Sequence, residues 1–171
     1  MIQVVLCDDH KIVRDGLSKI IGSFNDIDVI ADDIASGEEL LQRLRKTQPD
    51  VIILDVSLPG RSGLEVLKQI KIFYPDIKVL VLSMYPEDQF AIRMLKAGAS
   101  GYLHKDSAPE VLIEAIRTIQ NGGEYLFYLQ LSIFLMHYFY FLVLFCNLNQ
   151  LFLDSIIDFA YLFVFFGIPD I

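Results

Sequence analysis

Five short apolar runs, each rich in β-branched residues, alternate with segments that carry helical patterns, and this alternation constrains the fold more than any other feature. The runs are QVVLC (3–7), DVIADD (28–33), VIILD (51–55), KVLVLS (78–83) and GYLH (101–104). The pattern is typical of a parallel sheet with helices covering both faces. We therefore predict an α/β fold in which five βα units form a doubly wound parallel sheet.

Local signals mark where some of the predicted helices begin and end. A serine followed three residues later by a glutamate forms a capping box, which satisfies free N–H groups at a helix start. Ser36 precedes Glu39 in this way, and Ser107 precedes Glu110. The Asn-Gly-Gly run at 121–123 is typical of a helix end. The sequence thus predicts a last helix that is capped by Ser107 and ends before this run.

Polar side chains follow or close four of the predicted strands. Asp8 and Asp9 follow the first strand, Asp55 closes the third, Ser83 closes the fourth and Lys105 follows the fifth. A doubly wound sheet binds its ligand beyond the carboxyl ends of its strands. Any one acid at a strand end could simply cap the next helix. The joint pattern predicts a functional site at this edge.

Three converging carboxylates repel one another, so the predicted site requires a cation. Ligand sets made only of oxygen favour Mg²⁺. With the metal bound, Asp55 can stay ionised and attack a phosphoryl group, because carboxylates form aspartyl phosphates. The ammonium of Lys105 and the hydroxyl of Ser83 would then stabilise charge on the phosphoryl oxygens. The residues therefore predict a phosphorylation site on Asp55.

Four motifs, VVLCDDH, PDVIILDVSLPGRSGLEVL, VLVLSM and AGASGYLHKD, follow one another in this order. On these motifs residues 1–124 resemble the receiver domain of bacterial two-component response regulators, which has a flavodoxin-like (βα)5 fold. The segments HKIVRDGL, AGASGYLHKDSAPEVLIEAI and NGGEYL resemble the sequences of the NarL/FixJ (LuxR-type) class. Receivers of this class precede a helix-turn-helix DNA-binding domain. The resemblance implies a phosphoacceptor domain that ancestrally controls transcription.

The resemblance also assigns roles around the metal and the phosphoryl group. Asp55 would be the phosphoacceptor and a metal ligand, Asp9 a direct Mg²⁺ ligand and Asp8 a ligand through water. The backbone carbonyl of Ser57 would be a further ligand of the metal. The domain would not be an enzyme beyond Mg²⁺-dependent self-phosphorylation and dephosphorylation.

The remaining roles concern the response to phosphorylation. Lys105 would contact the phosphoryl oxygens and Ser83 would hydrogen-bond them. Tyr102 would be the aromatic switch residue, moving together with Ser83 as the domain shifts between two packings. The implied partners are a sensor histidine kinase, which donates the phosphoryl group, and a second copy of the chain after phosphorylation.

The composition changes after Glu124. All 14 Lys and Arg residues lie at or before Arg117, whereas residues 125–171 contain 10 of the 13 Phe. Contacts to phosphates and base edges need basic and polar side chains. We therefore do not expect DNA binding by this chain, and we predict two parts, a domain over 1–124 and an apolar tail over 125–171.

Three interpretations of the tail stay open. Residues 125–146 have no formal charge and are long enough to span a bilayer, which would anchor the domain in a membrane. The tail could instead cover an apolar surface of this protein or a partner. It could also be an out-of-frame reading in place of a lost effector domain, which the abrupt loss of basic residues favours.

Other features narrow the location and the function class. The N-terminus lacks the basic and apolar regions of a signal peptide, and the two cysteines, Cys7 and Cys146, indicate no disulfide framework, so we predict a cytoplasmic domain. Neither His10 nor His104 has a second His or Cys at ligand spacing, so neither indicates a transition-metal site. A phosphatase of haloacid-dehalogenase type would need an Asp where Ser57 stands, and the acidic first loop disfavours a flavin module.

Overall fold

The computed structural model describes residues 1–85 and 87–126. The chain divides into two compact units, Met1–Tyr128 and Leu129–Ile171, and all described residues belong to the first. This unit is a parallel sheet with strand order β2-β1-β3-β4-β5-β6. The predicted strands are β1 Ile2–Cys7, β2 Ile27–Ile34, β3 Val51–Asp55, β4 Lys78–Ser83 and β5 Gly101–His104. The predicted doubly wound α/β fold is confirmed.

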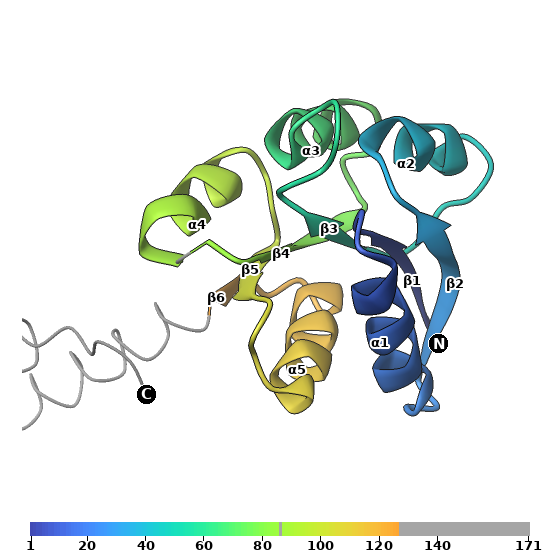
Figure 1. Cartoon of the computed structure of the whole chain (residues 1–171). Helices are drawn as coiled ribbons and strands as arrows, with labels where there is room; N and C mark the ends of the chain where they lie inside the picture. Colours follow the sequence, from blue (N-terminus) through green and yellow to red (C-terminus); the bar gives the residue numbers. More distant parts are fainter. Residues whose placement is uncertain (86, 127–171) are drawn as a thin grey trace, which may run out of the picture. The chain divides into compact units, whose positions relative to one another are not determined.

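Five helices cover the two faces of the sheet, with α2, α3 and α4 on one face and α1 and α5 on the other (Figure 1). They are α1 Lys11–Gly22, α2 Gly37–Leu44, α3 Gly63–Phe73, α4 Glu87–Lys96 and α5 Pro109–Gln120. Alternate residues of each strand point to opposite faces, so Val5 and Cys7 pack under α2 to α4 while Val4 and Leu6 pack with α5. Both faces of the central strands β1, β3 and β4 are buried, which explains their continuous apolar runs.

The helix caps agree with the sequence analysis at one position and correct it at another. Ser36 is the N-cap of α2, and its hydroxyl accepts a hydrogen bond from the Glu39 N–H at 3.3 Å. The predicted Ser107 cap is wrong, because α5 begins one residue later with Ala108 as N-cap and no side-chain cap. Ser107 instead donates its N–H to the His104 carbonyl in a turn. Pro109 presets the first helical φ, which fixes the start without a capping hydroxyl.

A short sixth strand, β6 Tyr125–Leu126, extends the sheet beyond the predicted domain end at residue 124. It pairs in parallel with β5, and the Tyr125 side chain is buried beside the core under α5. Among residues 1–85 and 87–126, no helix is long and apolar enough to cross a bilayer. The first two residues of the predicted membrane span 125–146 form β6, and the remainder lies outside the described residues.

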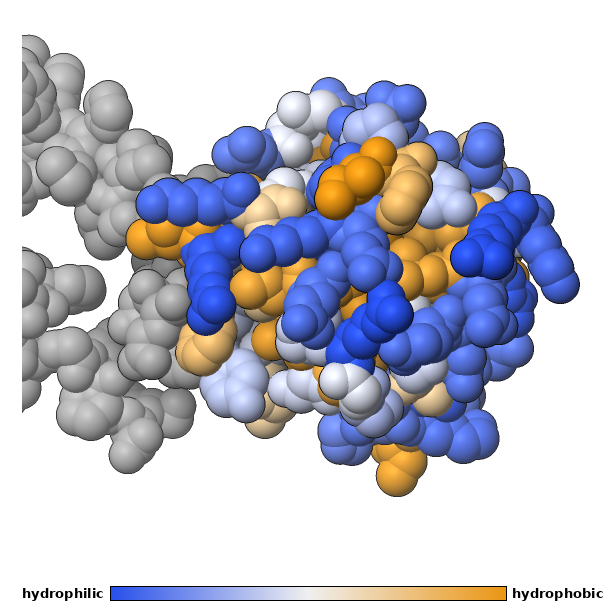
Figure 2. All heavy atoms as spheres, turned by 90° about the horizontal axis from the view of Figure 1, so that it is seen from above, coloured by the Kyte–Doolittle hydropathy of each residue, from blue (hydrophilic) through white to orange (hydrophobic). Residues whose placement is uncertain are grey.

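Seen from the side of α2, α3 and α4, the surface is mostly hydrophilic with apolar side chains exposed between polar ones (Figure 2). Ile72 and Phe73, at the end of α3, are among the exposed apolar residues. A hollow lies at the C-terminal ends of α2 and α3 and is lined by Leu41, Arg45, Gln69, Phe73 and Tyr74. Because helices and strands run in opposite directions in this fold, the hollow lies away from the carboxyl edge of the sheet.

The start of α3 approaches the end of β3 so closely that only glycine fits. A Cβ atom on Gly63 would lie 2.5 Å from the Asp55 carbonyl oxygen and 2.7 Å from the Val56 Cα. The Gly63 N–H also donates to the Val56 carbonyl at 3.0 Å. This contact fixes the backbone immediately after Asp55.

We expect Gly63→Ala to lower the free energy of unfolding by about 1–3 kcal/mol, because the added methyl group forces the backbone apart. The matched control is Gly16→Ala in α1, where a Cβ would meet nothing within 4 Å. In that position alanine should stabilise by about 0.4–1 kcal/mol. Urea unfolding of the full chain followed by circular dichroism measures both values, and equal effects at the two glycines would contradict the close approach.

Candidate functional site

The strand order brings the predicted site residues to one edge of the sheet. β1, β3, β4 and β5 are adjacent, and their register places Asp55 beside Leu82 and Ser83 beside His104. Asp8 directly follows β1 and Lys105 directly follows β5. Chain segments that are far apart in sequence therefore deliver their polar ends to the same place, as the sequence analysis predicted from strand ends alone.

Lys105 bridges two buried carboxylates. Its Nζ lies 2.9 Å from Asp55 Oδ2 and 2.6 Å from Asp8 Oδ2, and the three side chains are 10%, 1% and 5% exposed. Burial favours the neutral amine, but the hydrogen bond to Asp55 and the contact with Asp8 outweigh it and raise the pKa of Lys105. The residue is therefore a fixed positive charge between two negative ones.

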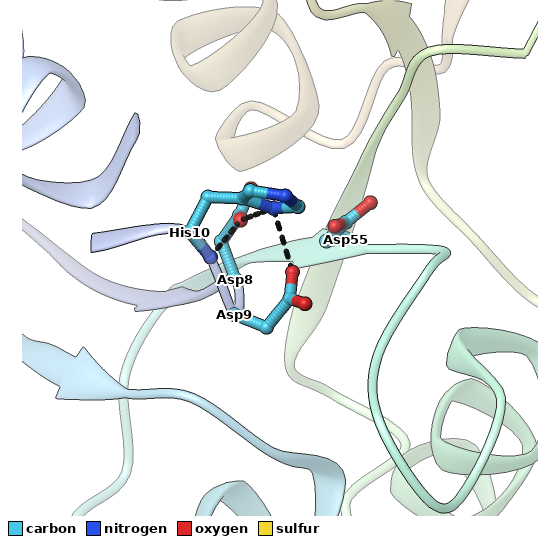
Figure 3. A group of neighbouring side chains, drawn as sticks. All are labelled: Asp8, Asp9, His10 and Asp55. Carbon is cyan, nitrogen blue, oxygen red and sulfur yellow. Dashed lines mark hydrogen bonds and ion pairs between the residues drawn. The ribbon is translucent and has the colours of Figure 1, made fainter. Parts of the chain in front are cut away.

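His10 joins the acidic loop in a way that the sequence analysis did not predict. Its backbone N–H donates to Asp8 Oδ1 at 2.8 Å, and its ring Nδ1 lies 3.2 Å from Asp8 Oδ1 and 2.7 Å from Asp9 Oδ1. Figure 3 shows the ring lying over both carboxylates, with Asp55 facing the same space. The His10 side chain is 64% exposed and that of Asp9 is 34% exposed, so these two face solvent while Asp8 and Asp55 do not.

The side chains at this edge fit a divalent cation. Ligand atoms of Asp8, Asp9, His10 and Asp55 all lie within 4.8 Å of one another. Opposite ligands of a six-coordinate Mg²⁺ are separated by about 4.2 Å, so the group is compact enough for one ion to contact several of its members. Asp8 Oδ2 is buried without a hydrogen bond, and its contact with Lys105 is an ion pair that lacks hydrogen-bond geometry. Three carboxylates against one lysine leave negative charge that a metal would neutralise.

Ser57 lies beside the Asp55 carboxylate, because its backbone N–H donates to Asp55 Oδ1 at 3.1 Å. This bond and the Lys105 contact occupy one oxygen each of Asp55. The predicted metal ligand at this position is the Ser57 carbonyl, which belongs to the same short loop. Its role as a ligand stays a prediction.

Arg14, on α1, holds the backbone of the acidic loop in place. The sequence analysis did not predict this role. The Arg14 guanidinium is buried and donates to two backbone carbonyls, those of Asp8 and Asp32, the second at 2.9 Å. Arg14 therefore ties the end of β1 to β2 through α1. An arginine at the spacing of Leu17 and Ile21, on the core-facing stripe of α1, was the available signal.

Ser83 and Tyr102 are both fully buried, and the backbone of Tyr85 links them. The Ser83 hydroxyl accepts a hydrogen bond from the Tyr85 N–H at 3.0 Å, and the Tyr102 hydroxyl donates to the Tyr85 carbonyl at 2.9 Å. The Tyr85 ring stacks on Phe90 of α4, with ring centroids 4.6 Å apart. The predicted hydroxyl and the predicted aromatic residue therefore act on the same loop between β4 and α4.

Cys7 lies next to the site, but its thiol is unreactive. Burial first, and then the nearby charges of Asp8 and Asp55, raise the pKa of its thiol to about 12. The thiol stays protonated at neutral pH and contacts the Ser36 carbonyl at 3.6 Å. Cys7 is thus a small core residue.

Comparisons with known proteins agree with this geometry. The family model described as "Response regulator receiver domain" matches residues 4–117. The chain is 38% identical over 125 residues to the transcriptional regulatory protein DegU of Brevibacillus brevis, covering 73% of this chain and 52% of that protein. The chain thus spans about half the length of the curated relatives that it matches.

Solved structures show the same similarity. A two-component response regulator of the LuxR family from Aurantimonas sp. has a TM-score of 0.69 and 34% identity, covering 72% of this chain and 88% of that one. The isolated receiver domain of RcsB from Salmonella enterica serovar Typhimurium, solved in the presence of the phosphomimetic BeF3⁻, has a TM-score of 0.68 and 27% identity. The match covers 74% of this chain and 94% of that domain.

We expect Lys105→Met to lower the free energy of unfolding by about 3–5 kcal/mol, because it leaves buried carboxylates without their cation. The raised pKa of Lys105 means that its stabilisation is complete below its ordinary value of 10.5 and is lost only as the pH rises through the higher folded value. The loss should therefore be fully visible at neutral pH. Added Mg²⁺ should restore part of it by binding the folded state.

Urea unfolding at neutral pH, with and without Mg²⁺, measures this effect. Lys68→Met is the matched control, because Lys68 is an exposed residue of α3. Equal stability of the two variants would show that Lys105 does not hold the buried carboxylates.

Proposed function

Because this chain belongs to the response regulator receiver domain family, we propose that Asp55 accepts a phosphoryl group from the phosphohistidine of a sensor histidine kinase. The observation that carries the proposal is the placement of a buried Asp55 carboxylate 2.9 Å from the Lys105 ammonium, beside the acidic pair Asp8 and Asp9. A carboxylate nucleophile, a fixed cation and a metal-binding cluster are the parts that phosphoryl transfer to an aspartate needs.

The transfer forms one bond and breaks another. An Asp55 carboxylate oxygen bonds to phosphorus while the bond from phosphorus to the kinase imidazole nitrogen breaks, and the nitrogen keeps the electron pair. Asp55 is 1% exposed and paired with Lys105, so the reaction requires the ammonium to leave the carboxylate. It moves onto the incoming phosphoryl oxygens and exchanges one anionic partner for another.

The metal-binding residues of the proposal are Asp8, Asp9, Asp55 and the Ser57 carbonyl. When bound, Mg²⁺ neutralises the clustered carboxylates and the phosphoryl oxygens. Other residues of the chain hold the proposed metal ligands in place. Arg14 fixes the Asp8 backbone, and Ser57 fixes one oxygen of Asp55 through its N–H.

In the proposal, the Ser83 hydroxyl couples phosphorylation of Asp55 to a change in the loop after β4. In the resting arrangement this hydroxyl accepts a hydrogen bond from Tyr85, and in the proposal it turns to donate to a phosphoryl oxygen. The Tyr85 N–H then loses its bond to the Ser83 hydroxyl, while the Tyr85 carbonyl keeps the bond from the Tyr102 hydroxyl. A change of this size, about 1 kcal/mol per hydrogen bond, can shift the balance between two arrangements of the loop.

The loop and α4 offer an apolar surface beside this switch. Met84, Tyr85 and Ile92 are 59%, 45% and 51% exposed. We place the phosphorylation-dependent homodimer contact here, because exposed apolar groups next to a moving loop can be covered by a second copy. DegU is named as a transcriptional regulator, so the ancestral output in the proposal is transcription control.

Residues 127–171 contain no Lys or Arg, and DNA binding by this chain is not part of the proposal. The proposal places the domain in the cytoplasm, in keeping with the free, buried thiol of Cys7. No observation favours the alternatives of a haloacid-dehalogenase-type phosphatase or a flavin module.

We expect the full chain, incubated with acetyl phosphate and Mg²⁺, to gain one base-labile phosphate per chain on Asp55. Intact-mass spectrometry measures the added mass, and Asp55→Asn should abolish it because an amide oxygen is a poor nucleophile. The matched control is Asp106→Asn, which removes an exposed carboxylate next to Lys105 and should label like the unchanged chain. Labelling that persists in Asp55→Asn would overturn the proposal.

A further inference from the structure

We propose that His104 is a positioning residue of the site, whose ring holds the loop after β4 in the resting arrangement and thereby slows phosphorylation of Asp55. The inference rests on the proposed function, because it concerns how that loop responds to the phosphoryl group. The sequence analysis considered His104 only as a metal ligand. The fold gives it another role, since it lies on β5 directly opposite Ser83 and directly before Lys105.

The first support is that two side chains of β5 hold consecutive carbonyl groups of this loop. Tyr102 and His104 are two residues apart on one strand, so their side chains point to the same face of the sheet. The Tyr102 hydroxyl donates to the Tyr85 carbonyl at 2.9 Å, and the His104 Nε2 lies 3.0 Å from the Met84 carbonyl oxygen. The strand therefore holds the loop at two adjacent points, and the sequence analysis assigned a switch role to Tyr102 but not to His104.

The second support is that the backbone fixes the direction of the His104 hydrogen bond. The Asp106 N–H donates to the His104 Nδ1, with 3.3 Å between the two nitrogen atoms, so this ring nitrogen is an acceptor. In a neutral imidazole the other nitrogen then carries the proton, and Nε2 donates it to the Met84 carbonyl. The Asp106 carboxylate, 3.6 Å from Nδ1, lies beyond hydrogen-bond distance. Both ring nitrogens thus have partners that match one tautomer.

The third support is the place of the ring between the two parts of the site that move in the proposed reaction. Lys105, which leaves Asp55 for the phosphoryl group, is the next residue, and its N–H donates to the Ser83 carbonyl at 2.8 Å. The ring is bonded on one side to the backbone after Lys105 and on the other to the loop after β4. The loop therefore cannot leave β5 at Met84 without breaking the His104 bond.

A bond that is made only in the resting arrangement shifts the balance toward that arrangement. One hydrogen bond changes such an equilibrium about fivefold. When a site reacts from the other arrangement, its apparent reactivity is reduced to the fraction of chains in that arrangement. Loss of the His104 bond should therefore speed the labelling of Asp55, whereas loss of a bond that only stabilises the fold would leave this rate unchanged or lower it.

The test compares three variants of the full chain. His104→Leu removes both ring nitrogens, His104→Gln keeps an amide N–H near the position of Nε2, and His104→Asn has an amide too short to reach the Met84 carbonyl. The initial rate of labelling by acetyl phosphate and Mg²⁺ is followed by intact-mass spectrometry. We expect it to be about fivefold higher in His104→Leu and His104→Asn. His104→Gln should label like the unchanged chain.

Hydrogen exchange of the Tyr85 N–H, measured without a phosphodonor, tests the hold on the loop itself. This N–H is bonded to the Ser83 hydroxyl rather than to His104, so its exchange reports the arrangement of the loop. Exchange should be about fivefold faster in His104→Leu and His104→Asn and unchanged in His104→Gln. The Tyr125 N–H, which donates to the Ser100 carbonyl, is the internal control and should exchange equally in every variant.

If His104→Leu fails to fold, the pair His104→Asn and His104→Gln carries both comparisons. Unchanged exchange in His104→Asn would overturn the hold on the loop, and faster exchange with an unchanged labelling rate would overturn the role in phosphorylation. Absence of labelling in the unchanged chain would instead contradict the proposed function, while the exchange comparison still decides whether His104 holds the loop.

Discussion

The ion pairs of Lys105 with Asp8 and Asp55 are the interaction on which the rest of the site depends. Each ion that is buried costs several kcal/mol in lost hydration, and the fold buries two carboxylates side by side at the ends of β1 and β3. The lysine that follows β5 offsets this cost at distances of 2.6 and 2.9 Å. The Asp55 carboxylate is thus held by a single cation, and in the proposed phosphorylation it is released when another anion takes the lysine.

The surrounding frame keeps the charged groups in place through contacts that are not themselves charged pairs. Arg14 donates to backbone carbonyls of the acidic loop and of β2, and Gly63 allows α3 to start directly against the end of β3. The loop after β4 is held by the Ser83 and Tyr102 hydroxyls at Tyr85 and by the His104 ring, whose Nε2 lies 3.0 Å from the Met84 carbonyl oxygen. The site thus combines a side at β1 and β3 that buried contacts hold with a loop after β4 that hydrogen bonds hold.

Sequence reasoning succeeded where a residue's environment follows from its position in a repeating element. The central strands β1, β3 and β4 were predicted to within one residue at each end, because they are buried and continuously apolar. It failed where another local interaction overrode the sequence pattern or where the element was too short to have one. Ser107 has the capping pattern, but Pro109 and a turn from His104 move the helix start to the next residue. The strand at Tyr125–Leu126 was not predicted, since two residues carry no periodicity and pair only because β5 offers an edge.

The sequence by itself determined the architecture and which polar residues stand at the strand ends that form the site. Alternating elements dictate a doubly wound sheet, and such a sheet gathers the residues at its strand ends, so Asp8, Asp55, Ser83 and Lys105 could be named from their positions alone. Only the tertiary structure decided which atoms meet. The pairing of Lys105 with both acids, the approach of His10 to Asp8 and Asp9, and the Tyr85 link depend on side-chain directions and loop paths. Those are set by packing between segments far apart in the chain, which no local pattern encodes.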